Sequence, residues 1–377
     1  MPNAAFEHKI ATNMSFQCPI WPPNSPEIES SISEIVASGD WGRYKSPHQE
    51  VLRKKLRDLT QTEHVRLCGS GSGAVEIALR AAGIGAGDEV VVAAYDYPGN
   101  LRAIEAVGAR PVLVDVDSDQ PVMNTAQVEQ ISKESPTENS VRAVLASHLY
   151  GIAAPMQRLA KICQQREWIL VEDACQVPGM MIDGRPAGSL GDISAISFGG
   201  SKPLTAGNGG ALLTNNTRLS ARMNAFLDRP SDSHPLSTLQ AAVLIPQLSD
   251  LGQFNVLRQA TVAHIESSVN VSLEGWTWLS KTSANVSATH YKVAWSCSSS
   301  DKRKRIIDEA ARLGVPIGAG FRAMSRTSER RCRKPHALDN SIRFGETTIV
   351  LDHAALLLQS EMHNELANAL IEVNLMA

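Results

Sequence analysis

Short apolar runs alternate with helix-like segments between residues 64 and 214, and this alternation constrains the fold more than any other feature of the chain. Apolar runs bounded by turn residues are typical of buried strands, and the segments between them are typical of crossover helices in βαβ units. We therefore predict an α/β fold whose large domain has a mostly parallel central sheet sandwiched by helices. The predicted strands are His64–Leu67, Glu89–Ala94, Pro111–Val116, Val141–Leu145, Trp168–Val171, Ile193–Phe198 and Ala211–Thr214.

Two of these runs lead directly into ionisable side chains. Trp168–Val171 is followed by Glu172 and Asp173, and Ile193–Phe198 is followed by a short turn and then Lys202. Ligands of open α/β sheets bind at the carboxyl ends of the strands, so we expect Asp173 and Lys202 to face one crevice. Pyridoxal 5'-phosphate (PLP) requires a lysine for its Schiff base and an acid beside its pyridinium nitrogen. A structural ion pair between the same two residues explains the pattern equally well.

A glycine-rich turn follows the first predicted strand. Residues 69–73 read Gly-Ser-Gly-Ser-Gly, and a helix is predicted over Ala74–Ala82, with Gly83 as its C-terminal stop. The free amides and the dipole at the start of such a helix favour phosphate. Many strand-to-helix turns are rich in glycine and serine for geometric reasons alone, so both interpretations stay open here.

Three ring-bearing residues also follow predicted strand ends: Tyr97, His148 and Tyr150. A ring at the carboxyl edge of the sheet is well placed to stack on a flat cofactor. A core aromatic residue with one wet edge produces the same pattern.

The length, composition and net charge of the chain exclude several classes of protein. The 377 residues are enough for about two domains, and the 43% hydrophobic and 20% charged content is ordinary for a soluble globular protein. A net charge of −3 does not indicate a nucleic-acid or anionic-membrane partner. No apolar run approaches the roughly 18 residues of a membrane-spanning helix, and the start of the chain lacks a secretory signal pattern. Six scattered cysteines without a CxxC pair favour reduced thiols in a cytoplasmic protein over disulfides or a metal site.

The pattern changes after Thr217. Helical periodicity dominates 216–228 and 237–270, and strand-like segments and two further helices follow. We predict an N-terminal arm over 1–45, a PLP-binding large domain over 46–244 and a small α+β C-terminal domain over 245–377. The basic segment from Arg326 to Lys334 is interpreted as a solvated face, with a site for a substrate diphosphate as the alternative.

The ordered set of motifs resembles the DegT/DnrJ/StrS sugar-aminotransferase family of fold-type-I PLP enzymes. The resemblance covers about residues 38 to 375 and is densest over 64–214. It implies a PLP-dependent aminotransferase that moves an amino group from glutamate or glutamine to a keto-sugar, often nucleotide-linked, or to a keto-cyclitol. Such enzymes serve amino-sugar or secondary-metabolite biosynthesis, and the family precedent is a homodimer. The matching strings are GSGSGAVEIALRAAGIGAGDEVVV, ARPVLVDVD, SHLYGIAAPM, VEDACQ, GSLGDISAISFGGSK, GNGGALLTN and LSTLQAAV.

The resemblance implies a role for each matching position. Lys202 falls on the Schiff-base lysine, which also moves the proton during transfer. Asp173 falls on the partner of the pyridine nitrogen, Gln176 on the residue that hydrogen-bonds the phenolic oxygen of the ring, and Tyr97 on the aromatic that stacks on the ring. The positions that match the family's phosphate-binding residues are Gly71, Ser72 and Ser197.

One segment departs from the family pattern. The family usually carries Gly-x-Asn-x-Arg before the helix that matches 236–243, and its Asn reaches the cofactor phosphate of the partner subunit. Ser233 and Pro235 occupy these positions here, which leaves the cross-subunit contact open, with Arg229 or His234 as replacements.

Three other functions compete with transamination. Some family members catalyse dehydration with His at the Schiff-base position, and Lys202 argues against that subclass, although another PLP-dependent elimination stays possible. The altered segment near Ser233 also fits a regulatory protein that keeps the fold. A dinucleotide-binding dehydrogenase fits poorly, because the glycine-rich turn has Ala74 in the place of the last glycine and the next strand-end acid, Asp96, sits between two tyrosines.

Overall fold

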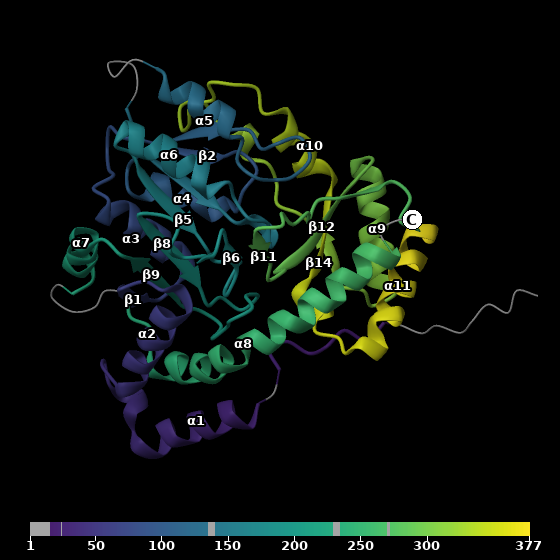
Figure 1. Cartoon of the computed structure of the whole chain (residues 1–377), viewed down its shortest axis with the longest axis horizontal. Coiled ribbons are helices and arrows are strands. Elements are labelled where there is room, and N and C mark those ends of the chain that lie inside the picture. The colour runs from purple at the N-terminus through teal and green to yellow at the C-terminus, as the bar shows by residue number, and fades with distance from the viewer. Residues whose placement is uncertain (1–15, 24, 135–139, 229–233, 270–271) are drawn as a thin grey trace, which may run out of the picture.

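The computed structural model describes residues 16–23, 25–134, 140–228, 234–269 and 272–377. Its main element is a seven-stranded sheet with the order β1-β9-β8-β5-β4-β2-β3 (Figure 1). Strands β8, β5, β4, β2 and β3 run parallel, and β9 is antiparallel to both of its neighbours. The carboxyl ends of β8, β5, β4 and β2 therefore meet at one edge. The strands are β1 (His64–Cys68), β2 (Glu89–Ala93), β3 (Arg110–Val114), β4 (Val141–Ser147), β5 (Ile169–Asp173), β8 (Ile193–Ser197) and β9 (Gly210–Thr214).

Alternate residues of the buried strands pack against helices on opposite faces of the sheet. Val90 and Val92 of β2 belong to the apolar core that contains α3, α4 and α7, whereas Val91 belongs to the core that contains α5 and α6. Side chains of a strand alternate between its faces, so an all-apolar run requires cover on both sides. The helices are α3 (Gly71–Ala81), α4 (Pro98–Ala106), α5 (Thr125–Ser132), α6 (Met156–Arg166) and α7 (Thr217–Leu227).

A second, antiparallel sheet of four strands has the order β10-β12-β14-β13. Its core includes Trp295 of β12, Ile306 of α9 and Leu366 of α11, all fully buried. A further helix, α10 (Asp339–Thr347), leads into β14. The elements of this part are β10 (Trp276–Trp278), β12 (Lys292–Cys297), α9 (Ser300–Arg312), β13 (Ile317–Ala319), β14 (Thr348–Asp352) and α11 (His363–Met376).

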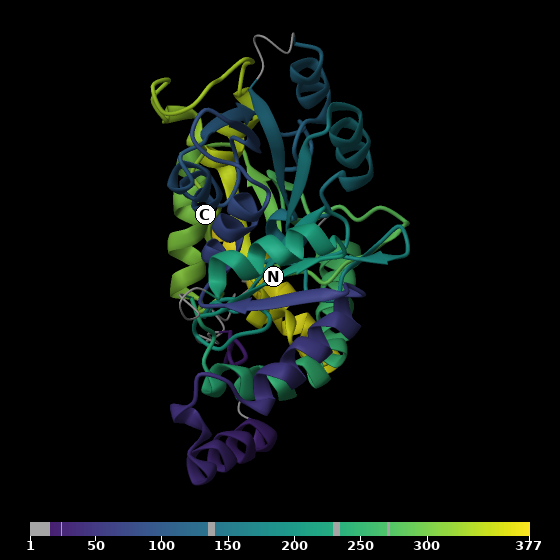
Figure 2. The same ribbon diagram turned by 90° about the vertical axis from the view of Figure 1, so that its left-hand side faces the viewer.

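The long helix α8 (Thr238–His264) runs from the first sheet to the second (Figure 1). Figure 2 shows α1 (Pro26–Ser38) and α2 (Pro47–Thr60) beside α8 at one end of the molecule. The predicted domain boundary at residue 245 falls within α8, which continues through Pro246. The division into domains stays a prediction. Within the described ranges, no helix is both long and apolar enough to span a membrane.

Two details differ from the sequence-based expectations. Helix α3 begins at Gly71 rather than at Ala74, because the Ser70 hydroxyl caps it by accepting the N–H of Gly73 at 3.0 Å. A small three-stranded sheet, β11-β6-β7, was not expected. Its strands have two residues each, too few for a detectable period, and it ties β11 of the C-terminal part to a hairpin after β5. The three strands are β6 (Met181–Ile182), β7 (Arg185–Pro186) and β11 (Val286–Ser287).

Candidate active site

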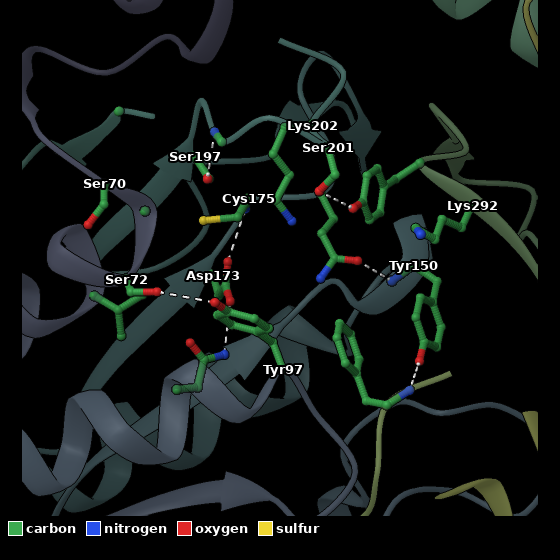
Figure 3. Close-up of a pocket in the computed structure, with 18 of the residues that line it drawn as sticks. Ser70, Ser72, Tyr97, Tyr150, Asp173, Cys175, Ser197, Ser201, Lys202 and Lys292 are labelled. Atoms are coloured by element: carbon green, nitrogen blue, oxygen red, sulfur yellow. Dashed lines mark hydrogen bonds between the residues drawn. The ribbon is translucent and has the colours of Figure 1, made fainter. Parts of the chain in front are cut away.

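One cavity of about 390 Å³ lies at the carboxyl edge of the large sheet (Figure 3). All seven predicted site residues line it, together with residues of the C-terminal part such as Tyr291 and Phe321. The cavity therefore combines the strand ends of the first sheet with the edge of the second. The predicted residues in its lining are Gly71, Ser72, Tyr97, Asp173, Gln176, Ser197 and Lys202.

The carboxylate of Asp173 is buried and held by neutral donors. Its Oδ1 accepts the backbone N–H of Cys175 at 3.0 Å. Its Oδ2 accepts a hydrogen bond from Nδ2 of Asn100 at 2.9 Å and lies 3.4 Å from the hydroxyl oxygen of Ser147. Asp173 and Lys202 both lie in the described part of the chain, and they form no ion pair with each other. The purely structural ion pair that the sequence left open is therefore wrong.

Lys202 is positioned by a tight turn and by an aromatic ring from the C-terminal part. Its backbone N–H donates to the carbonyl of Gly199 at 2.9 Å. Its Nζ lies 4.6 Å from the centre of the Tyr291 ring, and the Tyr291 hydroxyl lies 3.3 Å from Oγ of Ser201. Tyr291 directly precedes β12 and was not singled out from the sequence, because no local pattern relates it to Lys202.

The start of α3 and the end of β8 form a narrow cradle. A Cβ atom on Gly71 would lie 2.5 Å from Cβ of Ser197, so only glycine permits this approach. A Cβ on Gly210 would likewise lie 2.6 Å from the carbonyl oxygen of Ser70. The first-turn amides of a helix together with the hydroxyls of Ser72 and Ser197 suit a phosphate group.

Tyr97 and Gln176 border the same cavity from other elements. A Cβ on Gly99 would lie 2.1 Å from Cε1 of Tyr97, so the glycine leaves room for the ring, whose hydroxyl is 3.4 Å from Oγ of Ser72. Oε1 of Gln176 accepts the N–H of Tyr150 at 2.7 Å. The amide NH₂ of Gln176 then remains as a donor, which fits a ring oxygen.

The three ring-bearing residues at strand ends occupy different positions relative to the cavity. Tyr150 lines the cavity, and its ring stacks on Phe321 with centroids 5.5 Å apart at an angle of 10°. His148 does not line the cavity, so the stacking role considered for it is wrong. It is fully buried, with Nε2 3.1 Å from Oε1 of Glu172 and Nδ1 accepting the N–H of Ala154 at 3.0 Å. Burial opposes ionisation of Glu172, but hydrogen bonds from neighbours, led by His148, keep its pKa below the ordinary value.

A second buried acid lies beside Asp173 and was assigned no site role from the sequence. Asp96 is 1% exposed, and its Oδ2 lies 2.7 Å from Oγ of Ser147. Burial, followed by the nearby charge of Asp173, raises the pKa of Asp96 to about 7. A strand-end acid was visible in the sequence, but only the sheet order places it next to Asp173.

The basic segment near Arg333 lies away from the cavity. Arg331 binds Glu105 with both N···O distances at 2.7 Å. Arg333 binds Glu89, the first residue of β2, and also Glu134. Glu89 marks the amino end of β2, the opposite edge of the sheet from the cavity. Arg331 and Arg333 are thus engaged by acidic side chains, and the diphosphate site considered for the segment from Arg326 to Lys334 stays a prediction.

The segment that departs from the family pattern is only partly described. Arg229 and Ser233 lie outside the described residues. Pro235 lies against Gly69, just before α3, since a Cβ on Gly69 would be 3.5 Å from the Pro235 carbonyl oxygen. The cross-subunit phosphate contact thus stays an open prediction.

Comparison with known proteins agrees with this geometry. The chain is 29% identical over 268 residues to the L-glutamine:2-deoxy-scyllo-inosose aminotransferase of Streptomyces kanamyceticus, a match that covers 64% of this chain and only 62% of that enzyme. It is 25% identical over 337 residues to the GDP-perosamine synthase of Escherichia coli O157:H7, covering 85% of this chain and 90% of the synthase.

The fold is shared with known structures over nearly the whole chain. The crystal structure of 3-amino-5-hydroxybenzoic acid (AHBA) synthase superposes with a TM-score of 0.87 at 22% identity, covering 96% of this chain and 99% of that one. This similarity confirms the predicted α/β fold. The model of the DegT/DnrJ/EryC1/StrS family matches residues 24–370, and the chain therefore belongs to the DegT/DnrJ/EryC1/StrS aminotransferase family.

Proposed function

We propose that this protein is a PLP-dependent aminotransferase that transfers an amino group from glutamate or glutamine to a ketone on a sugar or cyclitol ring. The observation that carries the proposal is the convergence of Lys202, Asp173 and the first turn of α3 on one cavity. Family membership supports the reaction class, and the names of the similar enzymes support the acceptor class.

The cavity residues fit PLP part by part. The cradle formed by Gly71, Ser72 and Ser197 would hold the phosphate, and the buried carboxylate of Asp173 would face the pyridine nitrogen. The amide of Gln176 would donate to the ring oxygen, and Tyr97 would lie against the ring. When bound, PLP supplies the electron sink that stabilises a carbanion at the amino-bearing carbon.

Two residues perform the proton work in this proposal. The amine of Lys202 reaches the cavity and moves a proton to and from the substrate carbon as general base and acid. Asp173 would hold a proton at the pyridine nitrogen, because its buried carboxylate, hydrogen-bonded only to neutral donors among the described residues, favours a protonated partner. We also propose the cytoplasmic location expected for such an enzyme, which the thiol state of the cysteines supports. We further propose a homodimer, on the precedent of the family.

The decisive measurement is the absorption spectrum of the purified protein with PLP, before and after glutamate or glutamine is added. We expect a visible band that the donor converts to one at shorter wavelength. Lys202→Ala should abolish the initial band. The matched control is Lys54→Ala, which removes an exposed lysine of α2 and should leave the spectrum unchanged.

The other outcomes separate the competing functions. A visible band that neither donor shifts would favour a PLP-dependent elimination or a regulatory role. Absence of the band with PLP in excess would overturn the roles of Lys202 and Asp173 and revive a dinucleotide-binding function. Once the donor reaction is shown, keto-sugars and keto-cyclitols are screened as acceptors that restore the first band.

A further inference from the structure

Two buried carboxyl groups share their hydrogen-bond donors behind the cavity. Asp96 follows β2 and is 1% exposed, while Asp173 ends β5 and is 4% exposed. Nδ2 of Asn100 lies 2.9 Å from Oδ2 of Asp173 and 3.3 Å from Oδ2 of Asp96. Oγ of Ser147, at the end of β4, lies 2.7 Å from Oδ2 of Asp96 and 3.4 Å from Oδ2 of Asp173. The arrangement follows from the order of the sheet, in which β4 separates β2 from β5.

The number of hydrogen atoms decides how this cluster is protonated. The two amide hydrogens of Asn100 face three acceptors, because Nδ2 also lies 2.9 Å from Oγ of Ser147. Ser147 has a single hydroxyl hydrogen between the two carboxyl groups. One proton on Asp96 satisfies every group: Asp96 donates to Ser147, and Ser147 donates to Asp173. Oδ1 of Asp96 already accepts the N–H of Tyr97 at 2.6 Å, so the proton belongs on Oδ2, which faces Ser147.

The charges around Asp96 point the same way. The ionisable side chains that act on it in the described structure are Asp173 on β5 and Tyr150 after β4, and helix α4 adds only the neutral amide of Asn100. Burial raises the pKa of Tyr150 well above its ordinary value, so this phenol is neutral. Among the described residues, Asp96 is therefore influenced by the negative charge of Asp173 and by no cation. Two adjacent buried carboxylates rarely ionise together.

We propose that Asp96 is a positioning residue that holds a proton at neutral pH and, through Ser147, keeps Asp173 as the single oriented carboxylate opposite the pyridine nitrogen of the cofactor. The part that concerns the cofactor rests on the proposed function, whereas the proton on Asp96 does not. Loss of this proton turns the Ser147 hydrogen toward Asp96 and leaves Asp173 with one donor fewer.

The first test uses the protein without cofactor. The pKa of Asp96 in the folded chain, about 7, lies above the ordinary value of 3.8. The native state then binds more protons than the unfolded state between these values, so the wild type loses stability as pH rises through this window. Asp96→Asn cannot ionise and should not show this loss. We expect the melting temperature of Asp96→Asn, relative to the wild type, to rise from about pH 4 to about pH 7.

The control for this series is Asp58→Asn, which changes an exposed carboxyl group of α2 and should track the wild type at every pH. If the melting temperatures of wild type and Asp96→Asn change in the same way with pH, the proposal is overturned. Infrared difference spectra between the wild type and Asp96→Asn at about pH 6 give a second readout. The wild type should show the stretch of a protonated carboxyl group that the variant lacks. If Asp96→Asn does not fold, Asp96→Ser provides the comparison, and absence of the stretch in the wild type would overturn the proposal.

The second test adds PLP and follows the visible band against pH. The wild type should show a spectral change with an apparent pKa near that of Asp96, and both Asp96→Asn and Ser147→Ala should lose it. Ser147→Ala should keep the pH-dependent stability, because it removes the hydrogen bonds between Asp96 and Asp173 but leaves Asp96, the titrating group, in place. If the stability result appears but PLP does not bind, the proposed function fails and the proton on Asp96 stands. If PLP binds and transamination occurs but the melting temperatures of wild type and Asp96→Asn change in the same way with pH, the proposed function stands and the proton on Asp96 is ruled out.

Discussion

Nζ of Lys202 lies 4.6 Å from the centre of the Tyr291 ring, so the predicted catalytic lysine touches a residue of the C-terminal part of the chain. The Tyr291 ring is itself stacked on His353, at 5.8 Å and 28°. Burial lowers the pKa of His353 to about 3, so its imidazole is neutral and packs as an aromatic surface. The geometry of Lys202 thus depends on the C-terminal part as well as on β8.

Removing the Tyr291 ring should slow the reaction. A cation–π contact is worth about 1 to 2 kcal/mol when partly desolvated, and about 1.4 kcal/mol corresponds to a tenfold change in rate. We expect Tyr291→Ala to lower kcat/KM for the amino donor about tenfold. Tyr291→Phe keeps the ring, loses only the contact with Ser201, and should stay within about threefold of the wild type. Equal losses in both variants would assign the effect to the hydroxyl instead.

Gly71→Ala should weaken cofactor binding. The added Cβ would lie 2.5 Å from Cβ of Ser197, so the start of α3 must move away from the end of β8 and widen the cradle. Overpacking of this kind costs about 1 to 3 kcal/mol. We expect the dissociation constant of PLP, measured by spectral titration of the apoprotein, to rise at least about tenfold. Gly252→Ala is the control, because its Cβ would meet no atom within 4 Å. An unchanged dissociation constant in Gly71→Ala would place the phosphate elsewhere.

Glu172→Gln should destabilise the fold without a direct effect on the cavity. Glu172 accepts hydrogen bonds from the Ser194 hydroxyl and from the backbone amides of Gly188, Leu190 and Gly191, besides its contact with His148. Loss of buried, charge-assisted hydrogen bonds should lower the unfolding free energy by about 2 to 4 kcal/mol.

The pH dependence of this effect has a definite sign. The folded-state pKa of Glu172 lies below the ordinary value of 4.5, so its ionisation adds stability above that value, and this contribution is lost as pH falls through the folded-state pKa. The deficit of Glu172→Gln, measured by urea unfolding, should therefore be largest at neutral pH and shrink on acidification. Glu346→Gln, on an exposed position of α10, should show no deficit at any pH.

Arg333→Ala should separate stability from substrate affinity. Arg333 joins Glu89 and Glu134 at the edge of the sheet opposite the cavity. Loss of these partly buried ion pairs should cost about 1 to 3 kcal/mol of unfolding free energy. The KM for the acceptor should not change, and steady-state kinetics on the folded variant check this. A large rise in KM would instead assign a diphosphate-binding role to Arg333.

Much of the fold and part of the candidate site could be predicted from the sequence, because they depend on local patterns. An apolar run buried on both faces of a sheet must be apolar throughout, which made the strands visible. Strands joined by right-handed crossovers run parallel, so the residues that follow them share one edge. Asp173 and Lys202 could thus be assigned to one crevice from their places at the end of β5 and after β8.

The other features of the site could not be predicted from the sequence. They follow from which strands are neighbours and from contacts between segments that are distant in the chain. Tyr97, His148 and Tyr150 have similar positions after strands, yet His148 turns inward to Glu172 while the two tyrosines line the cavity. Tyr291 reaches Lys202 only because β12 of the second sheet contacts residues Leu149–Gly151, which follow β4. The sequence alone determined that an acid and a lysine stand at strand ends. Only the order β5-β4-β2 placed Ser147 between Asp173 and Asp96, since hydrogen bonds of this length require side chains held within a few tenths of an ångström.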